Sequence, residues 1–169
     1  MKTLQVIPSQ LKQVLIIVPP TIFQDHRGMY IETFNQEIYK NAGIDIEFLQ
    51  DDISISKKNV LRGIHGDNST WKLVSCLKGE IQLIVVNYDS DSNEYMKWTS
   101  IRIGESNLIQ VLIPPKFGNG HLVLSEFAIF NYKQSTYYDR NSQFSIKWND
   151  QRFNFSWLST APILSHRDS

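Results

Sequence analysis

The feature that most constrains the fold of this chain is a long series of short apolar runs, each followed by turn residues. The runs are rich in valine, isoleucine and aromatic residues, with glycine, proline, asparagine, aspartate or lysine between them. Such runs at this spacing are typical of antiparallel β-sandwiches and barrels. The predicted strands cover residues 14–18, 29–34, 53–56, 73–77, 81–88, 98–103, 108–113, 121–124, 128–133 and 144–148, and residues 34–41 are predicted to form a short helix.

The length of the chain fits one domain. Its 169 residues are enough to bury a core but too few for two ordinary domains, and the sequence has no repeat, linker or low-complexity stretch. We therefore expect a single all-β domain over residues 1–169. Closed or double-sheet barrels bind ligands at their mouth, so functional side chains are expected at strand ends that point inward.

Charge and apolar content exclude several classes of protein. Seventeen basic and seventeen acidic residues cancel, which argues against a nucleic-acid binder. The longest apolar runs are the length of a strand and too short to cross a membrane. Residues 1–13 lack the apolar core of a signal peptide, and Cys76 is the single cysteine, so no internal disulfide can form. These features predict a soluble cytoplasmic protein.

Several residues suit the binding of an anionic ligand. His65 lies between glycines at the end of the run Leu61-Arg-Gly-Ile-His65, three residues after Arg62. Arg27 and Arg62 each precede a glycine, and a guanidinium presents a fork of donors that matches phosphate oxygens. Each residue also has an ordinary structural interpretation, as a barrel-lining histidine or a solvated turn arginine. The same holds for Tyr132 and Tyr138, which would be core or rim aromatics in most barrels.

The order of the motifs is more informative than any one of them. The informative pieces, in order, are residues 23–32, 48–56, 61–65, 72–74, 79–80, 114–125, 132–133 with Tyr138, 148–150 and 164–168. Through these pieces the chain resembles the dTDP-4-dehydrorhamnose 3,5-epimerase family over residues 15–168. This resemblance implies a cupin-like jelly-roll β-barrel with short peripheral helices, a homodimer, and no metal or organic cofactor.

The resemblance implies a role for each matching residue. A ketone at C4 of a sugar acidifies the protons on C3 and C5, so a base can remove one and an acid can return a proton to the opposite face. His65 matches the base, Asp168 the carboxylate that orients it, Tyr132 the acid, and Lys72 the cation beside the enolate oxygen. The residues that match nucleotide-sugar contacts, some of them reaching in from the partner subunit, are Arg27, Glu32, Gln50, Arg62 and Tyr138.

The sequence departs from the family pattern at three places around the expected pocket. The loop between His65 and Lys72, residues 66–71, is about three residues shorter than is usual in the family. Asn119 replaces the histidine of the family motif Gly-Phe-x-His-Gly, and Leu83 replaces an aspartate. The last two positions line the sugar end of the pocket in the family, so Asn119 is expected to contact the sugar. The changes suggest a different sugar or a different set of inverted carbons.

A metal site is a weaker interpretation of the same histidines. Metal-binding barrels of the cupin type usually offer two histidines one residue apart plus a carboxylate. This chain has no His-x-His, and Asp67 stands two residues after His65. A site would have to combine His65, Asp67 and His121, and we predict none.

We therefore expect an isomerase that inverts C3, C5 or both in a nucleotide-linked 4-keto sugar, for the synthesis of surface polysaccharide. The sugar, a 6-deoxyhexose or a heptose, and the nucleotide, dTDP or GDP, stay open. Two alternatives are a nucleotide-sugar 3,4-ketoisomerase and a non-catalytic sugar-nucleotide binding module. Ketoisomerases of this type usually carry a second histidine where Asp67 stands, and a binding module has no need of His65, Tyr132 and Asp168 together.

Overall fold

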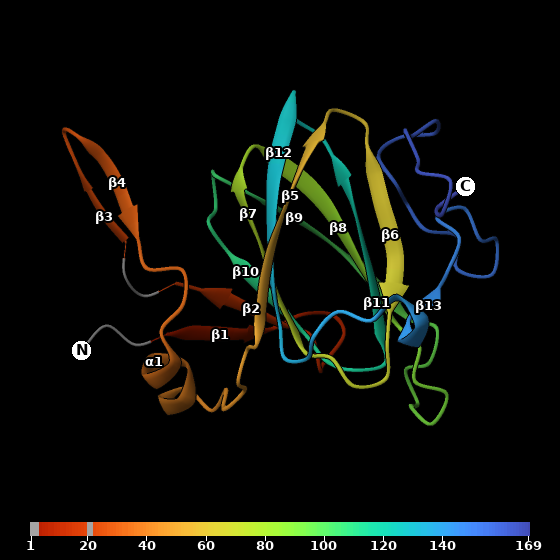
Figure 1. Cartoon of the computed structure of the whole chain (residues 1–169), viewed down its shortest axis with the longest axis horizontal. Helices are drawn as coiled ribbons and strands as arrows, with labels where there is room; N and C mark the ends of the chain where they lie inside the picture. The colour runs from red at the N-terminus through yellow and green to blue at the C-terminus, as the bar shows by residue number, and fades with distance from the viewer. Residues whose placement is uncertain (1–3, 20–21) are drawn as a thin grey trace.

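The computed structural model describes residues 4–19 and 22–169; the first three residues of the N-terminal segment and residues 20–21 lie outside this description. Thirteen strands, one α-helix and one 3₁₀ helix make up the regular structure (Figure 1). The strands are β1 (Gln5–Pro8), β2 (Leu15–Val18), β3 (Ile22–Asp25), β4 (Gly28–Ile31), β5 (Gln50–Lys57), β6 (Leu61–Gly66), β7 (Lys72–Lys78), β8 (Glu80–Asn87), β9 (Trp98–Gly104), β10 (Gln110–Ile113), β11 (Phe117–Val123), β12 (Phe127–Gln134) and β13 (Phe144–Ser145); the helices are α1 (Gln36–Asn41) and η1 (Arg140–Ser142).

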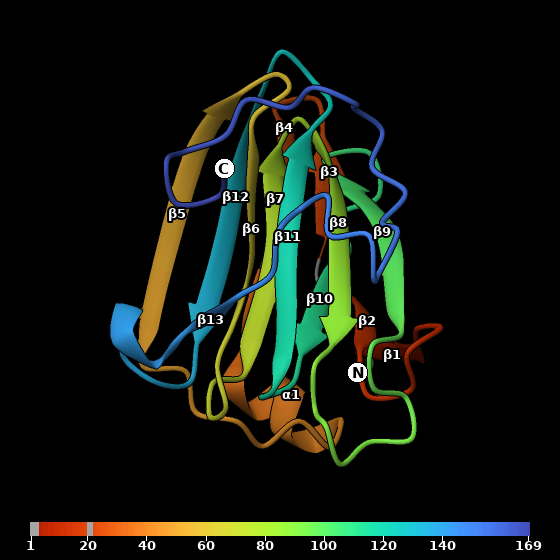
Figure 2. The ribbon, with the colours of Figure 1, turned by 90° about the vertical axis from the view of Figure 1, so that its right-hand side faces the viewer.

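Two antiparallel sheets face each other and form a jelly-roll barrel (Figure 2). The six-stranded sheet has the order β1-β2-β10-β7-β12-β5, and the five-stranded sheet has the order β13-β6-β11-β8-β9. The predicted all-β jelly-roll class with short peripheral helices is confirmed. Successive side chains of a strand point to opposite faces of the sheet, so every second side chain of β5, β7 and β12 points toward the opposing sheet.

The predicted strands differ from the observed ones mainly where glycine or proline interrupts the apolar pattern. The prediction missed β1, β3 and β6. The run 121–124 is the second half of β11, which begins at Phe117 and includes Gly118 and Gly120. The run 144–148 is a strand only over Phe144–Ser145, although Ile146 continues the pairing by exchanging backbone hydrogen bonds with Ile64.

The main core lies between the two sheets and extends up to the pocket, which Val74 and Phe130 also line. It combines buried aliphatic residues of β7, β8 and β10, such as Val74, Val85 and Val111, with Phe117 and Phe130. A second cluster packs α1 against β2 and β10 through Tyr39, Ile17 and Leu112. Burial at this scale is the main stabilising contribution to such a fold, because it removes apolar surface from water.

Two peripheral segments flank the barrel. The β3–β4 hairpin projects away from it and exposes Phe23, Met29 and Tyr30 (Figure 1). On the other side, the segment after β13 crosses the outer face of the five-stranded sheet, where Phe153 packs against side chains of β6 and β8 (Figure 2). No helix in the described part of the chain is long and apolar enough to cross a membrane.

Candidate active site

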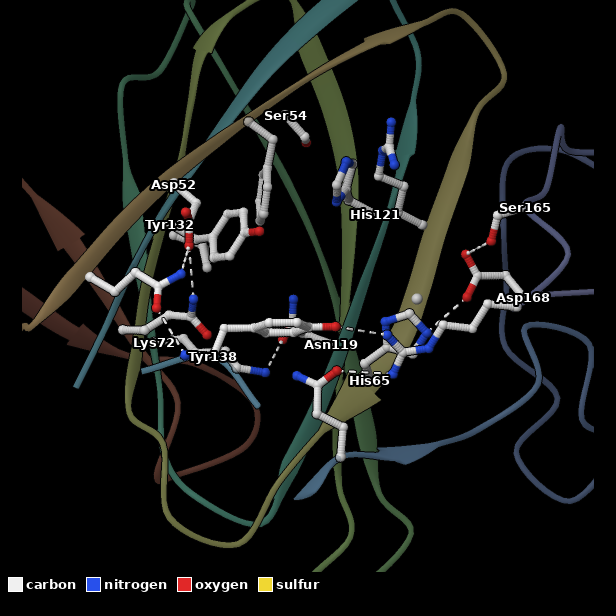
Figure 3. Close-up of a pocket in the computed structure, with 18 residues that line it drawn as sticks. Asp52, Ser54, His65, Lys72, Asn119, His121, Tyr132, Tyr138, Ser165 and Asp168 are labelled. Atoms are coloured by element: carbon white, nitrogen blue, oxygen red, sulfur yellow. Dashed lines mark hydrogen bonds and ion pairs between the residues drawn. The ribbon is translucent and has the colours of Figure 1, made fainter. Parts of the chain in front are cut away.

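The barrel holds a pocket of about 380 Å³ between the two sheets (Figure 3). One wall comes from β5, β7 and β12, and the other from β6 and β11, with the C-terminal segment closing one side. The side chains that line it are mostly polar. They belong to Gln50, Asp52, Ser54, Arg62, His65, Lys72, Val74, Asn119, His121, Phe130, Tyr132, Gln134, Tyr138, Gln143, Ser165, Arg167 and Asp168, with Gly63 contributing backbone.

His65 and Asp168 form a hydrogen-bonded pair although 103 residues separate them. His65 Nε2 lies 2.7 Å from Asp168 Oδ1, and Ser165 Oγ donates to Asp168 Oδ2 at 2.9 Å. Burial alone would raise the pKa of Asp168, but the hydrogen bonds from His65, Ser165 and the Gly63 backbone outweigh it and lower that pKa. The carboxylate is therefore ionised at neutral pH, and its hydrogen bond to Nε2 fixes the orientation of the His65 ring.

Tyr132 stands on β12 in the sheet opposite His65 (Figure 3). It is half-buried, and its ring lies 5.5 Å from that of Phe130. Burial raises the pKa of Tyr132, and the nearby Asp52 and Tyr138 act in the same direction, while Arg62 opposes them. The phenol thus keeps its proton at neutral pH and can donate it to a group bound in the pocket.

Lys72 is the buried cation of the pocket. Its Nζ donates a hydrogen bond to Asn119 Oδ1 at 3.3 Å, and Asn119 is paired in register with His65. Burial lowers the pKa of Lys72, while the charge of Asp67 opposes this shift. Asp67 also shapes the short loop 66–71, because its Oδ1 accepts hydrogen bonds from the backbone amides of Ser69 and Thr70.

Polar side chains at the pocket rim are linked to one another. Gln50 Oε1 accepts from the backbone amide of Tyr138 at 2.8 Å, and Gln50 Nε2 donates to Asp52 at 2.7 Å. The guanidinium of Arg167 donates to the hydroxyl of Tyr138 at 3.2 Å. Arg62 reaches the pocket from β6, where its Nε donates to Ser56 Oγ.

Two of the predicted binding residues lie apart from this pocket. Arg27 is in the turn of the projecting β3–β4 hairpin, and its guanidinium pairs with Asp25 of the same turn at 2.6 Å. Glu32 follows β4 at the base of that hairpin. The other eight predicted site residues all line the pocket, so the structure brings together His65, Lys72, Tyr132, Asp168, Gln50, Arg62, Asn119 and Tyr138.

The structure also changes the interpretation of two positions. Leu83 is fully buried in the main core, and it is not among the residues that line the pocket as described. Arg167 lines the pocket but was not singled out from the sequence, although it lies in the recognised segment 164–168. No group of three His, Cys, Asp or Glu side chains among the described residues is placed to hold a metal ion.

The arrangement suits proton transfer at carbon. A histidine held by a carboxylate and a protonated tyrosine lie on opposite walls of one pocket, and the buried Lys72 lines the same pocket, where a positive charge can stabilise an oxyanion. A small molecule with an acidic C–H bond could thus lose a proton on one side and gain one on the other.

Known proteins are similar to this chain in fold and in sequence. The profile of the family described as dTDP-4-dehydrorhamnose 3,5-epimerase matches residues 8–169. The dTDP-4-dehydrorhamnose 3,5-epimerase of Salmonella typhimurium is 38% identical over 97% of this chain and 92% of its own. The epimerase of Legionella pneumophila, solved with dTDP-4-keto-L-rhamnose, superposes with a TM-score of 0.92 and 35% identity, covering 98% of this chain and 89% of that one. A 3'-monoepimerase of Streptomyces bikiniensis, solved with dTDP-quinovose, gives 0.88 and 26%, covering 95% and 83%.

Fold and relatives together define an isomerase of the sugar-nucleotide epimerase class. Because the family profile covers residues 8–169 and the Salmonella relative is 38% identical, the chain belongs to the dTDP-4-dehydrorhamnose 3,5-epimerase family.

Proposed function

We propose that this protein inverts C3, and then C5, of a nucleotide-linked 4-keto sugar. The observation that carries the proposal is the placement of the His65–Asp168 pair and Tyr132 on opposite walls of one pocket. Inversion requires a base on one face of the sugar ring and an acid on the other. His65 can act as the base because it can accept a proton, and Tyr132 can act as the acid because it holds one.

The chemistry follows from the ketone. His65 removes the proton on the carbon beside C4, and the bonding electrons move onto the C4 oxygen as an enolate. Lys72 stabilises that oxygen, because a preorganised charge in a buried site is most effective where charge develops. Tyr132 then returns a proton to the opposite face of the same carbon. Once His65 has released its proton to solvent and Tyr132 has taken one up, the sequence repeats at C5 when the ring presents its second acidic proton to His65.

The proposed substrate is a nucleoside diphosphate sugar, carrying either a 6-deoxyhexose or a heptose. Two of the similar structures hold dTDP-linked sugars, which favours dTDP, while GDP stays a second candidate nucleotide. The product would serve the synthesis of surface polysaccharide. No cofactor is needed for this reaction, since each step moves only a proton.

One experiment tests the reaction class. The protein is incubated in D2O with dTDP- and GDP-linked 4-keto sugars, and the signals of C3 and C5 are followed by NMR. An epimerase incorporates deuterium and changes the coupling pattern at the inverted carbon. Movement of the carbonyl to C3 would instead identify a 3,4-ketoisomerase, and binding without exchange would identify a binding module.

Asp168 provides a second test, because its role depends on its charge. Asp168→Asn keeps the size of the side chain but removes the negative charge that is hydrogen-bonded to the His65 ring. We expect kcat to fall by more than the affinity for substrate, and the acidic limb of the pH profile to shift. Truncation before Ser165 should have the same effect, and a fully active truncated enzyme would refute the pairing.

The same substitution has a consequence for stability. The native pKa of Asp168 lies below its ordinary value, so this carboxylate stabilises the fold at neutral pH. That contribution is lost as the pH falls through the lowered pKa. As the pH is lowered, the thermal midpoint of the wild-type protein should therefore fall more steeply than that of Asp168→Asn.

We further propose a homodimer in which the hairpin of one subunit completes the pocket of the other. Phe23 on the hairpin is 58% exposed and Tyr30 is 64% exposed. On the edge strand β5, Ile53 and Ile55 are 59% and 63% exposed. Exposed apolar patches of this kind mark interaction surfaces, and an open edge strand needs a cover. Arg27 sits on this hairpin, so it would contact substrate across the interface.

Arg27 and Arg62 are expected to act on binding. Their phosphate contacts would be equally strong in the ground and transition states, so Arg→Ala at either position should raise KM by more than it lowers kcat. Steady-state kinetics at several ionic strengths would measure this. The opposite split would assign these arginines a part in the chemical step.

Co-expression decides whether Arg27 acts across the dimer. In a mixed dimer of a His65→Asn subunit and an Arg27→Ala subunit, one pocket combines an intact His65 with an intact Arg27 from the partner. Activity should therefore reappear in the mixture although each parent variant is impaired. No recovery would show that Arg27 serves the pocket of its own subunit.

A further inference from the structure

The residues that line the pocket form successive levels, each made of side chains at the same height on neighbouring strands. Tyr132 on β12 pairs with Asp52, and two residues along, Phe130 pairs with Ser54. On the other wall Asn119 pairs with His65, and the next pocket-facing pair is His121 with Arg62. Two residues along a strand correspond to roughly 6–7 Å. His121, Arg62, Phe130 and Ser54 thus form a level next to the one that holds His65 and Tyr132. Of these, Ser54 and His121 are labelled toward the top of Figure 3.

His121 lines this level with an unsatisfied polar atom. The side chain is buried, with 4% of the residue exposed, and its Nε2 has no hydrogen-bond partner among residues 4–19 and 22–169. Its ring stacks on that of Phe130 with centroids 4.1 Å apart and an angle of 24°, which fixes its orientation. A buried polar atom without a partner costs free energy, so such a group in a pocket wall indicates a ligand contact.

The charge state of the ring defines what it can offer. Burial, with a smaller contribution from the positive charge of Arg62, lowers the pKa of His121 to about 3. The imidazole is therefore neutral at physiological pH and has one N–H to donate. A neutral donor beside Arg62 adds a directional hydrogen bond to an anion without adding repulsion between two cations.

The geometry of the substrate points to what would meet this donor. In a nucleoside diphosphate sugar the diphosphate is attached at C1, across the ring from C4. Lys72 pairs with Gln134, one level beyond Tyr132 on the side away from Phe130. If the C4 oxygen faces Lys72 and the C3 and C5 protons lie between His65 and Tyr132, C1 faces the level of Arg62 and His121.

We propose that His121 is a substrate-binding residue that donates a hydrogen bond from Nε2 to the sugar-proximal phosphate of the nucleoside diphosphate. This inference rests on the proposed function and adds to it a residue that binds the phosphate. Arg62 supplies the charge and His121 supplies a fixed, buried donor behind it. Ser54 lines the same level, and its Oγ likewise lacks a partner among the described residues.

The test compares His121→Phe with His121→Gln. Phenylalanine keeps the stacking on Phe130 and removes the donor, whereas glutamine retains a donor at a position similar to Nε2. Calorimetric titration with dTDP, with GDP and with inorganic pyrophosphate isolates the phosphate contact, because none of these probes contains the sugar. A lost hydrogen bond to a charged group corresponds to about tenfold weaker binding or more. We expect that loss in His121→Phe for each probe that wild type binds, and partial recovery in His121→Gln.

Kinetics and stability separate binding from folding. In His121→Phe, KM should rise while kcat measured by deuterium exchange at saturation stays close to wild type, since the contact is equally strong in ground and transition states. The thermal midpoint should not fall, because the substitution removes an unsatisfied buried group.

Each outcome has a defined meaning. Equal affinities of wild type and His121→Phe for the sugar-free probes would overturn the assignment, as would a loss confined to the complete nucleotide sugar, which would place the contact on the sugar. Failure of the wild-type protein to bind any of the three probes would overturn the proposed function itself, and this inference with it.

Discussion

Replacement of His65 by asparagine is expected to lower solvent deuterium exchange at C3 and at C5 by at least about 10²-fold, the lower range for a lost general base. Asparagine has a similar size and retains hydrogen-bonding capacity toward Asp168, but it does not titrate near neutral pH. Both carbons should be affected because the same histidine is proposed to remove both protons. That histidine is His65, which is linked to the buried carboxylate of Asp168 by a hydrogen bond of 2.7 Å.

The measurement is NMR-detected deuterium uptake under single-turnover conditions. His166→Asn is a matched control, because His166 is exposed and does not line the pocket as described. It should exchange at the wild-type rate. A His65→Asn protein that exchanged at that rate would remove His65 from the role of base and leave Tyr132 as the residue to examine next.

The fold was predictable from the sequence where burial alternates along a strand. Residues 81–88 and 128–133 read as strands because every second side chain must face the core, and β8 and β12 occupy these segments. β1 escaped prediction because it is a short edge strand that ends in a proline, so its sequence carries little of this alternation.

The glycine-containing strands were harder to predict for a different reason. A side chain at Gly66 would place its Cβ 2.4 Å from the Phe117 carbonyl oxygen, and one at Gly120 would lie 2.9 Å from that of Arg62. These glycines are required by the close approach of β6 and β11, which is a tertiary property. Local sequence preference treats the same residues as turn formers, so it misses β6 and the beginning of β11.

The site could be predicted only through the order of its motifs. Nothing in the spacing of His65 and Asp168 indicates that their side chains meet, because that contact depends on how the C-terminal segment crosses the sheet. The resemblance supplied the pairing, and it also selected Tyr132 among neighbouring tyrosines. It did not select His121, whose role in the pocket wall emerges from burial and the lack of a partner.

The departures from the family pattern have unequal weight in the structure. Asn119 accepts the hydrogen bond of Lys72 and lines the pocket, so it alters the wall against which the sugar lies. The short loop 66–71 is fixed by Asp67 and carries the chain directly into Lys72. Leu83 belongs to the core, and its effect on the sugar must pass through its neighbours. Asn119, the change that lines the pocket, therefore bears most directly on which carbons invert.

Replacement of Tyr132 by phenylalanine should separate exchange from inversion. His65 can remove a proton and return it to the same face, so deuterium wash-in should remain measurable. Inversion requires a donor on the other face within hydrogen-bond reach of the carbon, and the variant lacks it. The epimerised product should therefore disappear. A Tyr132→Phe enzyme that still formed epimer at the wild-type rate would assign the acid to another group, such as Tyr138.

Products trapped from the wild-type enzyme show the order of events at the two carbons, and Tyr132→Phe is the comparison. Processing C5 requires the ring to shift so that a second proton faces His65, and Asn119 forms part of the wall for that movement. We expect wild type to invert C3 first and C5 second, which appears in the NMR couplings of products trapped by chemical reduction of the ketone. In Tyr132→Phe both carbons should exchange while neither coupling pattern changes, because loss of the acid affects the two steps alike. Trapped wild-type product inverted at C5 with C3 untouched would reverse the order proposed for the reaction.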